Sequence, residues 1–318
     1  MELSIEEIVS ARDRIAGYVR RTPVIGWEAP EIPASVTLQL EFLQVGGSFT
    51  ARGACHRLLR EEPSRIAGGV VTASGGNHGV GVAYAAVRLG VPVTVFLPDS
   101  APVTTERRLL GMGASVVRGG RAWDDAWVKA LAFAAETGAL SVHPFADPAV
   151  LAGQGTVGLE LHEQAPGLDV VVVAIGGGGL IAGVASAYSK LSPGTRIIGV
   201  EPVGAPSMRE SVKAGRVVEL AEVRTIAGTL APRAVGPNTL SIASKLVSEI
   251  VLVTDDEMRS AMRRLWDDLR ILVEPAGAAA VAALLSGKVP VAGARSVGAL
   301  VCGANVDAAL AAQVIGSA

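Results

Sequence analysis

Short apolar runs alternate along this chain with longer alanine-rich segments of helical period, and this pattern narrows the possible folds more than any other. The apolar runs occupy residues 69–72, 93–97, 170–175, 196–200, 249–253 and 296–301. Helical segments follow the first three runs at 80–89, 104–110 and 180–188. Runs that are apolar throughout are typical of strands buried on both faces, which occur in parallel sheets. The sequence therefore predicts an α/β protein built on parallel sheets.

Composition limits the classes of partner. A chain of 318 residues is long enough for about two domains, and its 50% hydrophobic and 18% charged residues predict a folded protein. Lys and Arg number 28 against 30 Asp and Glu, which gives a net charge of -2. Because no basic block is present to neutralise a phosphate backbone, we expect no nucleic-acid partner.

The sequence also indicates the compartment. The two cysteines, Cys55 and Cys302, cannot form a disulfide framework, and the N-terminal segment carries acids where a signal peptide carries basic residues. We therefore predict a cytoplasmic protein. Residues 170–189 are uncharged and about as long as a membrane helix. Four glycines interrupt this segment, so a buried strand, a turn and a helix are expected there, and no membrane partner.

The four consecutive glycines, Gly176–Gly179, form the first candidate site. They lie between an apolar run and a helical segment, where successive N–H groups can point into one concavity at a helix N-terminus. Such a turn suits a phosphate group. Its spacing is neither the dinucleotide fingerprint nor a Walker loop. The alternative is a tight crossing between strand and helix that requires small residues.

A second glycine-rich loop, Thr72–Gly79, also follows an apolar run and precedes a helix expected to begin near Val80. Ser74, Asn77 and His78 offer side-chain donors there, which suit an anionic or phenolic oxygen. The alternative is that Asn77 and Ser74 only cap the helix.

Two weaker candidates complete the set. In the turn 45–54, Ser48 is expected to be the N-cap of a helix, and Phe49 could stack on a ring. An ordinary capped helix explains this turn equally well. Cys302 is expected at a strand end, where open α/β sheets bind ligands. A lone thiol beside a glycine is also common in buried packing.

Taken together and in this order, these segments resemble the threonine/serine dehydratase group of the fold type II (tryptophan synthase β-like) pyridoxal phosphate enzymes. The resemblance runs nearly end to end. Further matching motifs are Arg21–Pro23, Leu38–Glu41, His143–Phe145, Ala152–Thr156, Gly199–Pro202 and Val273–Gly277.

The resemblance implies two open twisted α/β domains with the cofactor in the cleft between them. A large domain would comprise residues 1–67 and 147–318, and a small domain residues 68–146. It also implies a homodimer or homotetramer that binds a small amino acid.

The resemblance further implies a role for each site residue. Pyridoxal 5′-phosphate would be held by Gly176, Gly177, Gly178 and Gly179 at its phosphate, Phe49 against its ring, Asn77 at its phenolic oxygen and Cys302 at its ring nitrogen. The substrate carboxylate would be received by Ser74, Gly75, Gly76 and His78. A neutral partner at the ring nitrogen leaves the ring a weaker electron sink, which favours β-elimination.

The chain departs from the family at the central position. The family reads Gly-Ser-Phe-Lys at this turn, and its lysine bonds the cofactor as an imine and shuttles the α-proton. This chain has Thr50, whose alcohol can do neither. Its lysines all lie outside the motifs, at Lys129, Lys190, Lys213, Lys245 and Lys288. We therefore predict that the cofactor binds without covalent attachment. Two further positions where the family commonly has lysine are Gln39 and Thr105.

Smaller departures affect the rest of the expected site. Gly75 stands where racemase-like members have a serine, which disfavours racemisation. In the divalent-metal site of some members Glu201 and Ala205 match, but Ser207 replaces an aspartate, so no metal is expected. The segment 226–230 also differs from the corresponding family segment, which suggests that this wall of the site is altered.

Three functions remain open from the sequence. The first is an ammonia-lyase for a small β-hydroxy amino acid, impaired or altered by loss of the lysine. The second is a non-catalytic protein that binds pyridoxal phosphate or an amino acid. The third is an enzyme of a different reaction that uses another base such as His78. Turnover of serine or threonine separates the first from the second.

Overall fold

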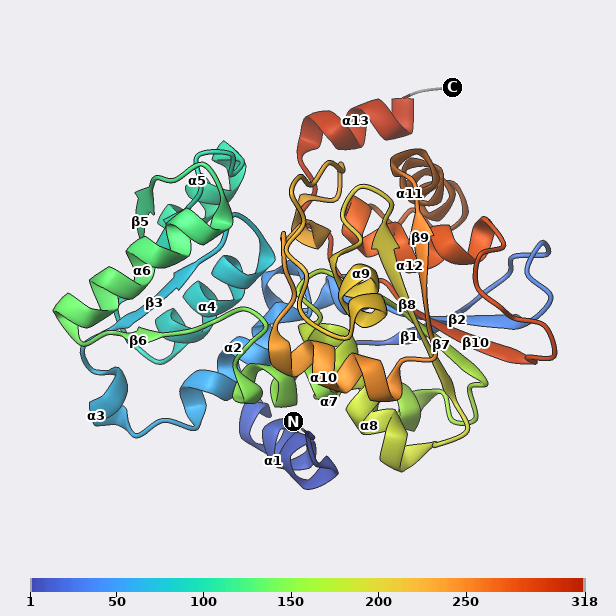
Figure 1. The fold of residues 1–318 in the computed structure, drawn as a ribbon, viewed down its shortest axis with the longest axis horizontal. Coiled ribbons are helices and arrows are strands. Elements are labelled where there is room, and N and C mark those ends of the chain that lie inside the picture. The colour runs from blue at the N-terminus through green and yellow to red at the C-terminus, as the bar shows by residue number, and fades with distance from the viewer. Residues whose placement is uncertain (1, 317–318) are drawn as a thin grey trace.

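The chain forms two sheets with helices on both sides of each, as described for residues 2–316 by a computed structural model (Figure 1). The larger sheet has the strand order β1-β2-β10-β7-β8-β9, and the smaller has the order β5-β4-β3-β6. The strands of the larger sheet are β1 (Val24–Trp27), β2 (Ser35–Gln39), β7 (Val170–Ala174), β8 (Arg196–Pro202), β9 (Glu249–Val253) and β10 (Ser296–Leu300). The strands of the smaller sheet are β3 (Val70–Ala73), β4 (Val93–Leu97), β5 (Ser115–Arg118) and β6 (Leu140–Ser141).

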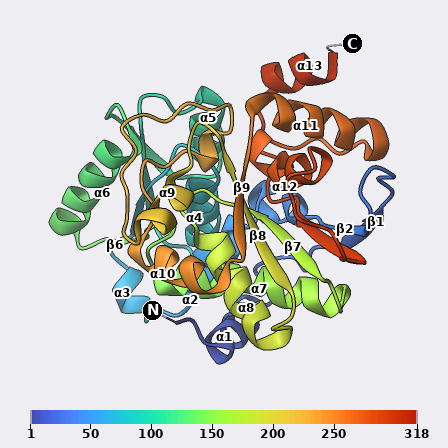
Figure 2. The ribbon, with the colours of Figure 1, turned by 45° about the vertical axis from the view of Figure 1, so that its right-hand side comes forward.

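Helices α11 and α12 lie on one side of the larger sheet, and α7, α8 and α10 lie on the other (Figures 1 and 2). The α-helices are α1 (Ile5–Ile15), α2 (Thr50–Leu59), α3 (Pro63–Ile66), α4 (Asn77–Arg88), α5 (Val103–Gly111), α6 (Trp123–Thr137), α7 (Pro148–Gln164), α8 (Gly179–Leu191), α9 (Ser207–Ala214), α10 (Pro237–Leu246), α11 (Asp255–Leu269), α12 (Pro275–Leu285) and α13 (Ala308–Gly316). Short 3-10 turns occur at η1 (Glu41–Leu43), η2 (Val45–Gly47) and η3 (Gly228–Leu230).

The predicted α/β class with parallel sheets is confirmed. Each expected apolar run forms a strand, and every described pairing is parallel except that of β1 with β2. Residues 170–173 are fully buried in β7, between β10 and β8. A central strand covered on both faces has no position for a polar side chain, which explains why this run is apolar throughout.

The smaller sheet shows how alternating side chains divide between two helix layers. Val70 and Val93 pack in a cluster with residues of α4, whereas Val71 and Ala73 pack with residues of α6. Successive strand residues point to opposite faces, so α4 and α6 cover opposite sides of the sheet. The four strands of this sheet lie within residues 70–141.

The uncharged segment 170–189 forms β7, a glycine turn and most of α8. Among the described residues, no helix combines the length and the hydropathy that crossing a bilayer requires.

Candidate functional site

The glycine turn forms an open helix N-terminus. β7 ends at Ala174, and α8 begins at Gly179 with Gly178 as its N-cap at a φ of 90°. No side chain caps α8, and the N–H groups of Gly176–Gly179 have no hydrogen-bond acceptor among residues 2–316. Unsatisfied N–H groups at a helix N-terminus attract an anion, which fits a phosphate group.

Neighbouring protein atoms explain why these positions are glycine. A Cβ at Gly177 would lie 2.1 Å from the Phe145 ring, and one at Gly176 would lie 2.8 Å from the Thr229 carbonyl oxygen. A Cβ at Gly178 would lie 2.5 Å from Met208 Cε. The turn is therefore packed closely by the chain itself. Packing thus requires small residues at these positions, and the N–H groups of the turn keep no acceptor among the described residues.

The turn that carries Phe49 and Thr50 differs in one detail from expectation. Helix α2 begins at Thr50 without a side-chain cap, so the prediction of Ser48 as N-cap was wrong. The Ser48 hydroxyl instead lies 2.8 Å from the Thr50 hydroxyl, which donates to the Asn77 carbonyl oxygen at 2.8 Å. The Phe49 N–H donates to the Cys302 carbonyl oxygen at 3.3 Å. This turn thus meets both the Asn77 loop and the end of β10.

Asn77 lies at the centre of a polar cluster. Helix α4 begins at Asn77 itself, earlier than the expected start near Val80, and no side chain caps it. The Asn77 side-chain amide donates to Glu274 Oε1 at 2.5 Å, and its side-chain oxygen, Oδ1, accepts from the Asn305 amide at 2.5 Å. One hydrogen of the Asn77 amide remains available, as a bond to a phenolic oxygen requires.

The predicted substrate loop divides into two parts. Ser74 Oγ accepts from the Gly76 N–H at 3.2 Å, and a Cβ at Gly76 would lie 2.8 Å from Thr229 Cγ2. This part of the loop therefore borders the 226–230 wall. His78 points elsewhere: its Nε2 bonds the Val142 carbonyl oxygen at 3.3 Å, and burial lowers its pKa to about 4.

Glu274 and Thr229 complete the site, and the sequence did not assign either a role. Thr229 Oγ1 lies 3.5 Å from Glu274 Oε2, while its carbonyl borders Gly176. The contacts therefore run without a break from the glycine turn through Thr229, Glu274 and Asn77 to Thr50. Glu274 had a signal in the sequence, because it is the one charged residue in the apolar segment 271–285.

Cys302 follows β10 and is buried. Its thiol donates to the Ala276 carbonyl oxygen at 3.4 Å, and burial together with the Glu274 carboxylate raises the pKa of Cys302. The thiol is therefore neutral, which matches the neutral group expected beside a ring nitrogen.

The residues of the family's metal site are arranged differently. The buried Glu201 carboxylate accepts from the N–H groups of Met208 at 2.7 Å and Arg209 at 2.9 Å, at the N-terminus of α9. Burial raises the pKa of Glu201 to about 7. The Ala205 N–H bonds Pro202, and residues 2–316 hold no cluster of three or more His, Cys, Asp or Glu suited to a metal. The donor set does not fit a divalent cation.

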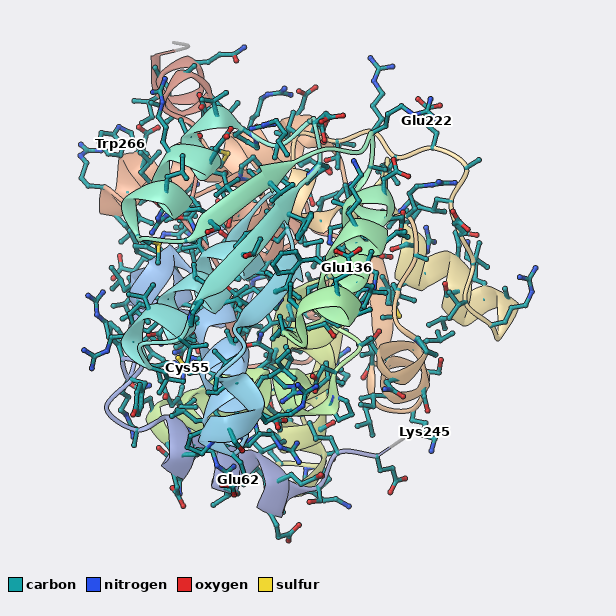
Figure 3. The ribbon with its side chains drawn as sticks, turned by 90° about the vertical axis from the view of Figure 1, so that its left-hand side faces the viewer. Cys55, Glu62, Glu136, Glu222, Lys245 and Trp266 are labelled. Atoms are coloured by element: carbon teal, nitrogen blue, oxygen red, sulfur yellow. The ribbon has the colours of Figure 1, made fainter. Side chains whose placement is uncertain are left out.

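No lysine replaces the missing amine. Lys129, Lys190, Lys213 and Lys245 are exposed, and Lys245 projects at the edge of the molecule in Figure 3. The half-buried Lys288 pairs with Glu257 at 2.6 Å.

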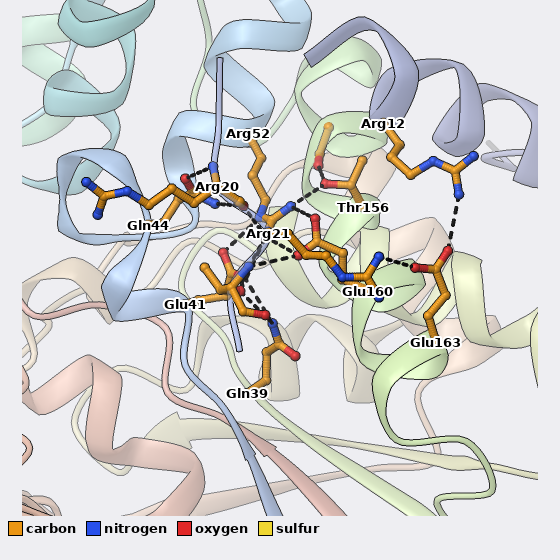
Figure 4. A network of polar contacts seen from close by, with 12 residues as sticks. Arg12, Arg20, Arg21, Gln39, Glu41, Gln44, Arg52, Thr156, Glu160 and Glu163 are labelled. Atoms are coloured by element: carbon orange, nitrogen blue, oxygen red, sulfur yellow. Dashed lines mark hydrogen bonds and ion pairs between the residues drawn. The ribbon is translucent and has the colours of Figure 1, made fainter. Parts of the chain in front are cut away.

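The buried side chain of Arg52, two residues after Thr50, holds α2 in place. Its guanidinium is fully buried and bonds both Glu41 and Glu160 at 2.7 Å, with Thr156 at 3.2 Å (Figure 4). Burial acts to lower the pKa of Arg52, but the two carboxylates outweigh it and raise the pKa. The network ties α2 to α7 and to the end of β2, and so positions Phe49 and Thr50.

Two mainly parallel α/β sheets and an open glycine turn at the start of α8 are the features of the class of α/β proteins that bind phosphate groups. The family model described as pyridoxal-phosphate dependent enzyme matches residues 15–303. The chain belongs to this family, and its fold is that of the fold type II members.

Named relatives cover nearly all of the chain. It is 41% identical over 302 residues to an L-threonine ammonia-lyase of Geobacter sulfurreducens, covering 94% of this chain and 75% of the relative. It is 41% identical over 318 residues to a phenylserine dehydratase of Ralstonia pickettii, covering 98% of this chain and 96% of the relative. The structure of maize serine racemase superimposes with a TM-score of 0.95 at 33% identity, covering 99% of this chain and 98% of that one.

Proposed function

We propose that this chain binds pyridoxal 5′-phosphate without covalent attachment, and that a dehydratase activity on small β-hydroxy amino acids is impaired by the absence of the lysine. The observation that supports the proposal is the open helix N-terminus at Gly176–Gly179, taken together with Thr50 at the position that the resemblance assigns to the lysine. When bound, the cofactor withdraws electrons from the substrate α-carbon and eases loss of the β-hydroxyl group.

The described contacts support a role for each residue. The N–H groups of the glycine turn would bind the phosphate, Phe49 would lie against the ring, and Cys302 would face the ring nitrogen. The Asn77 amide, already fixed by Glu274, would donate to the phenolic oxygen. Within the Ser74–Gly76 loop the Gly75 N–H group would bind the substrate carboxylate, because the Ser74 N–H donates to Phe96 and the Gly76 N–H to Ser74 Oγ. We omit His78 from this group, because its Nε2 bonds Val142.

Elimination is favoured over racemisation by the environment of Gly75. A Cβ at this position would lie 3.2 Å from Ala101 Cβ and 3.4 Å from Pro98 Cγ. A serine there, as a second acid on the opposite face, would be tightly confined. Relatives named for threonine and phenylserine favour a β-hydroxy amino acid as the substrate class.

The arrangement of the chain is part of the proposal. Residues 1–67 and 147–318 would form the large domain and residues 68–146 the small one, with the cofactor between them. Assembly as a homodimer or homotetramer is proposed from the resemblance.

A non-catalytic binding protein is the second candidate. Thr50 Oγ1 already donates to the Asn77 carbonyl oxygen, and an alcohol has a pKa far above that of a useful base. The site therefore keeps its binding residues while position 50 cannot move a proton from the substrate.

One experiment tests the proposal. The protein is titrated with pyridoxal 5′-phosphate, followed by absorbance, and its intact mass is measured after borohydride reduction. We expect binding without a mass increase, and a covalent adduct on any of the five lysines would contradict it.

The Thr50→Lys variant should form the adduct and should release ammonia from serine or threonine about 10² to 10⁴ times faster than the unmodified chain. Thr50→Val is the matched control and should do neither. Rapid ammonia release from the unmodified chain would indicate another base. Covalent attachment without turnover in the Thr50→Lys variant would favour the binding protein.

A further inference from the structure

Four aromatic rings gather at the start of α6, although Phe, Trp and Tyr make up only 4% of the chain. The rings of Trp123 and Trp127, one helical turn apart, stack with their centroids 5.8 Å apart and their planes at 9°. The His143 ring meets both of them edge-on, at 5.4 Å and 4.9 Å. Phe145 completes the group, with its centroid 5.7 Å from that of Trp123 and 4.7 Å from that of His143. We call these four residues the aromatic cluster.

Packing of α6 on its sheet does not account for the whole aromatic cluster. The residues of α6 that are fully buried against this sheet are the small Ala126 and Ala130, whereas Trp123 and Trp127 are half-buried. Part of the surface of both indole rings is therefore left uncovered by the chain. The motif His143–Phe145 is shared with the family, but the two tryptophans lie outside the shared motifs. The resemblance therefore does not explain them.

The aromatic cluster joins the two glycine-rich loops of the site. The Trp123 indole N–H donates to the Ala73 carbonyl oxygen at 2.8 Å, directly before the Ser74–Gly76 loop. At the other end of the cluster, the Phe145 ring lies against Gly177, where a Cβ would lie 2.1 Å from the ring. Edge and face contacts between the rings connect these two ends. The cluster therefore extends from the loop proposed for the substrate carboxylate to the turn proposed for the phosphate.

Thr229 joins the same two loops at a second place. A Cβ at Gly76 would lie 2.8 Å from Thr229 Cγ2, and a Cβ at Gly176 would lie 2.8 Å from the Thr229 carbonyl oxygen. The proposed function places a substrate carboxylate at Gly75 and a cofactor phosphate at the glycine turn. A ligand that spans the two loops in this way is bordered by Thr229 and by the aromatic cluster.

The chemistry of the aromatic cluster suits an aromatic ring on the ligand. Aromatic rings attract one another in offset-stacked and edge-to-face arrangements, and both tryptophans leave ring surface available for such a contact. Burial lowers the pKa of His143 to about 4, so this ring is uncharged near neutral pH and offers no cation to an acidic side chain. A methyl group would cover little of the two indole rings, and a phenyl group would cover far more.

We propose that Trp123 and Trp127 select β-hydroxy amino acids that carry an aryl group on the β-carbon over serine and threonine. The inference rests on the proposed function and narrows its substrate class. The two tryptophans are specificity-determining residues, which contact the substrate side chain and take no part in breaking bonds.

The test uses two ligands that differ only in the substrate side chain. Phosphopyridoxyl-phenylserine and phosphopyridoxyl-threonine are the reduced adducts of pyridoxal 5′-phosphate with each amino acid, prepared in the same configuration. Each combines the phosphate, the ring and the carboxylate in one stable molecule, and neither needs a lysine in order to bind. In calorimetric titrations of the unmodified chain we expect the phenylserine adduct to bind at least about tenfold more tightly.

The two ways of failing are distinct. Equal affinities of the two adducts would overturn the inference and leave the proposed function standing. If neither adduct nor pyridoxal 5′-phosphate binds the folded chain, the proposed function is rejected and the inference with it.

Variants locate the preference in the aromatic cluster. Trp123→Ala should reduce the affinity ratio of the two adducts to within about threefold, and Trp123→Phe, which keeps an aromatic ring, should restore most of it. Trp127→Ala should also lower the ratio and provides a second test if Trp123→Ala does not fold. Trp266→Ala is the matched control, because Trp266 is a half-buried tryptophan of α11 beside Arg270, and it should leave the ratio unchanged (Figure 3). A ratio unaltered by both cluster variants would contradict the inference.

Discussion

At the scale of single residues, Thr50 stands out because its surroundings still match a cofactor site. Its hydroxyl is buried and bonded to Ser48 and to the Asn77 carbonyl. The residues on either side of the expected ring, Phe49 and Cys302, are joined by a backbone hydrogen bond. If position 50 is that of the lysine, as we propose, threonine there is accommodated with both of its hydroxyl contacts made inside the protein.

A side chain at Gly178 should weaken binding of the cofactor phosphate. Gly178 has a φ of 90°, and a Cβ there would lie 2.5 Å from Met208 Cε and 2.9 Å from Thr239 Cβ. Both the strained backbone and the contacts would displace the N–H groups at the start of α8. We expect Gly178→Ala to weaken pyridoxal 5′-phosphate binding by at least about tenfold, measured by fluorescence or absorbance titration.

Gly228→Ala is the control for this prediction. Gly228 lies in the neighbouring η3 turn, where a Cβ would meet no atom within 4 Å. The affinity of the Gly228→Ala variant for pyridoxal 5′-phosphate should equal that of the unmodified chain. If Gly178→Ala binds as tightly as the unmodified chain, with an unaltered circular dichroism spectrum, the phosphate binds elsewhere.

Sequence reasoning located some of these residues and missed others for a physical reason. The glycine turn and Asn77 lie next to apolar runs, so their places at strand ends could be predicted. The contacts of Glu274 and Thr229 could not, because Glu274 meets Asn77 across 197 residues of the chain and Thr229 meets Glu274 across 45. The role of Ser48 was mistaken because its hydroxyl bonds Thr50 instead of capping the helix.

At the scale of elements, the strands that could be predicted are those with a continuous apolar run. β5 and β6 escaped prediction because they are short and lie at the edges of their sheet, where side chains need not be apolar. The antiparallel β1 likewise lies at an edge, and its pairing with β2 depends on the loop between them. The presence of a continuous apolar run thus decided what the sequence revealed: β2 is interior but alternates with polar residues and was not predicted, whereas the apolar β9 lies at an edge and was.

From the network around Arg52 we predict how the residue at position 39 affects the free energy of unfolding. The buried Gln39 donates to Thr22 and Glu41, but its Oε1 has no partner among the described residues. The network holds two carboxylates and one guanidinium. An added cation should balance it, so Gln39→Lys should raise the free energy of unfolding by about 1 kcal/mol. Gln39→Glu should lower it by about 3 kcal/mol or more.

Urea denaturation of the unmodified chain, Gln39→Lys and Gln39→Glu measures their free energies of unfolding. Exposed Arg12 and Glu163 form a surface ion pair, so Glu163→Gln is the control and should change the free energy by less than about 1 kcal/mol. A Gln39→Lys variant less stable than Gln39→Glu would show that packing, and not charge, governs this position.

At the scale of the whole molecule, the buried His78 and the half-buried His143 should make stability depend on pH. Burial lowers the pKa of both His78 and His143 to about 4, from an ordinary value of 6.5. His143 Nδ1 accepts the N–H groups of Phe145 at 3.2 Å and Ala146 at 2.9 Å, and Phe145 packs against Gly177. Protonation of Nδ1 would remove both hydrogen bonds beside the glycine turn.

The direction of the pH effect follows from the lowered pKa values. The unfolded chain takes up protons near pH 6.5, whereas the folded chain does so only near pH 4. The contribution of these two histidines to stability is therefore complete above pH 6.5 and is lost as pH falls towards 4, by up to about 3 kcal/mol for each histidine. Glu201, whose pKa is raised to about 7, contributes in the opposite direction. Denaturation between about pH 7.5 and pH 5 measures the slope.

The His78→Gln variant tests whether His78 causes part of this dependence of stability on pH. Glutamine can still donate to the Val142 carbonyl but does not titrate, so the loss of stability with falling pH should be smaller in the variant. An identical slope in both proteins would assign the effect to other groups.

The position of β10 has a consequence for synthesis on the ribosome. β10 (Ser296–Leu300) lies between β2 and β7, so the strand made last joins halves of the larger sheet that were made long before. The strands of the smaller sheet emerge within residues 70–141 and can pair early. A nascent chain therefore carries an incomplete larger sheet until β10 has been made. Cys302 follows β10 directly, so the site proposed for the ring is assembled only after this last of the described strands.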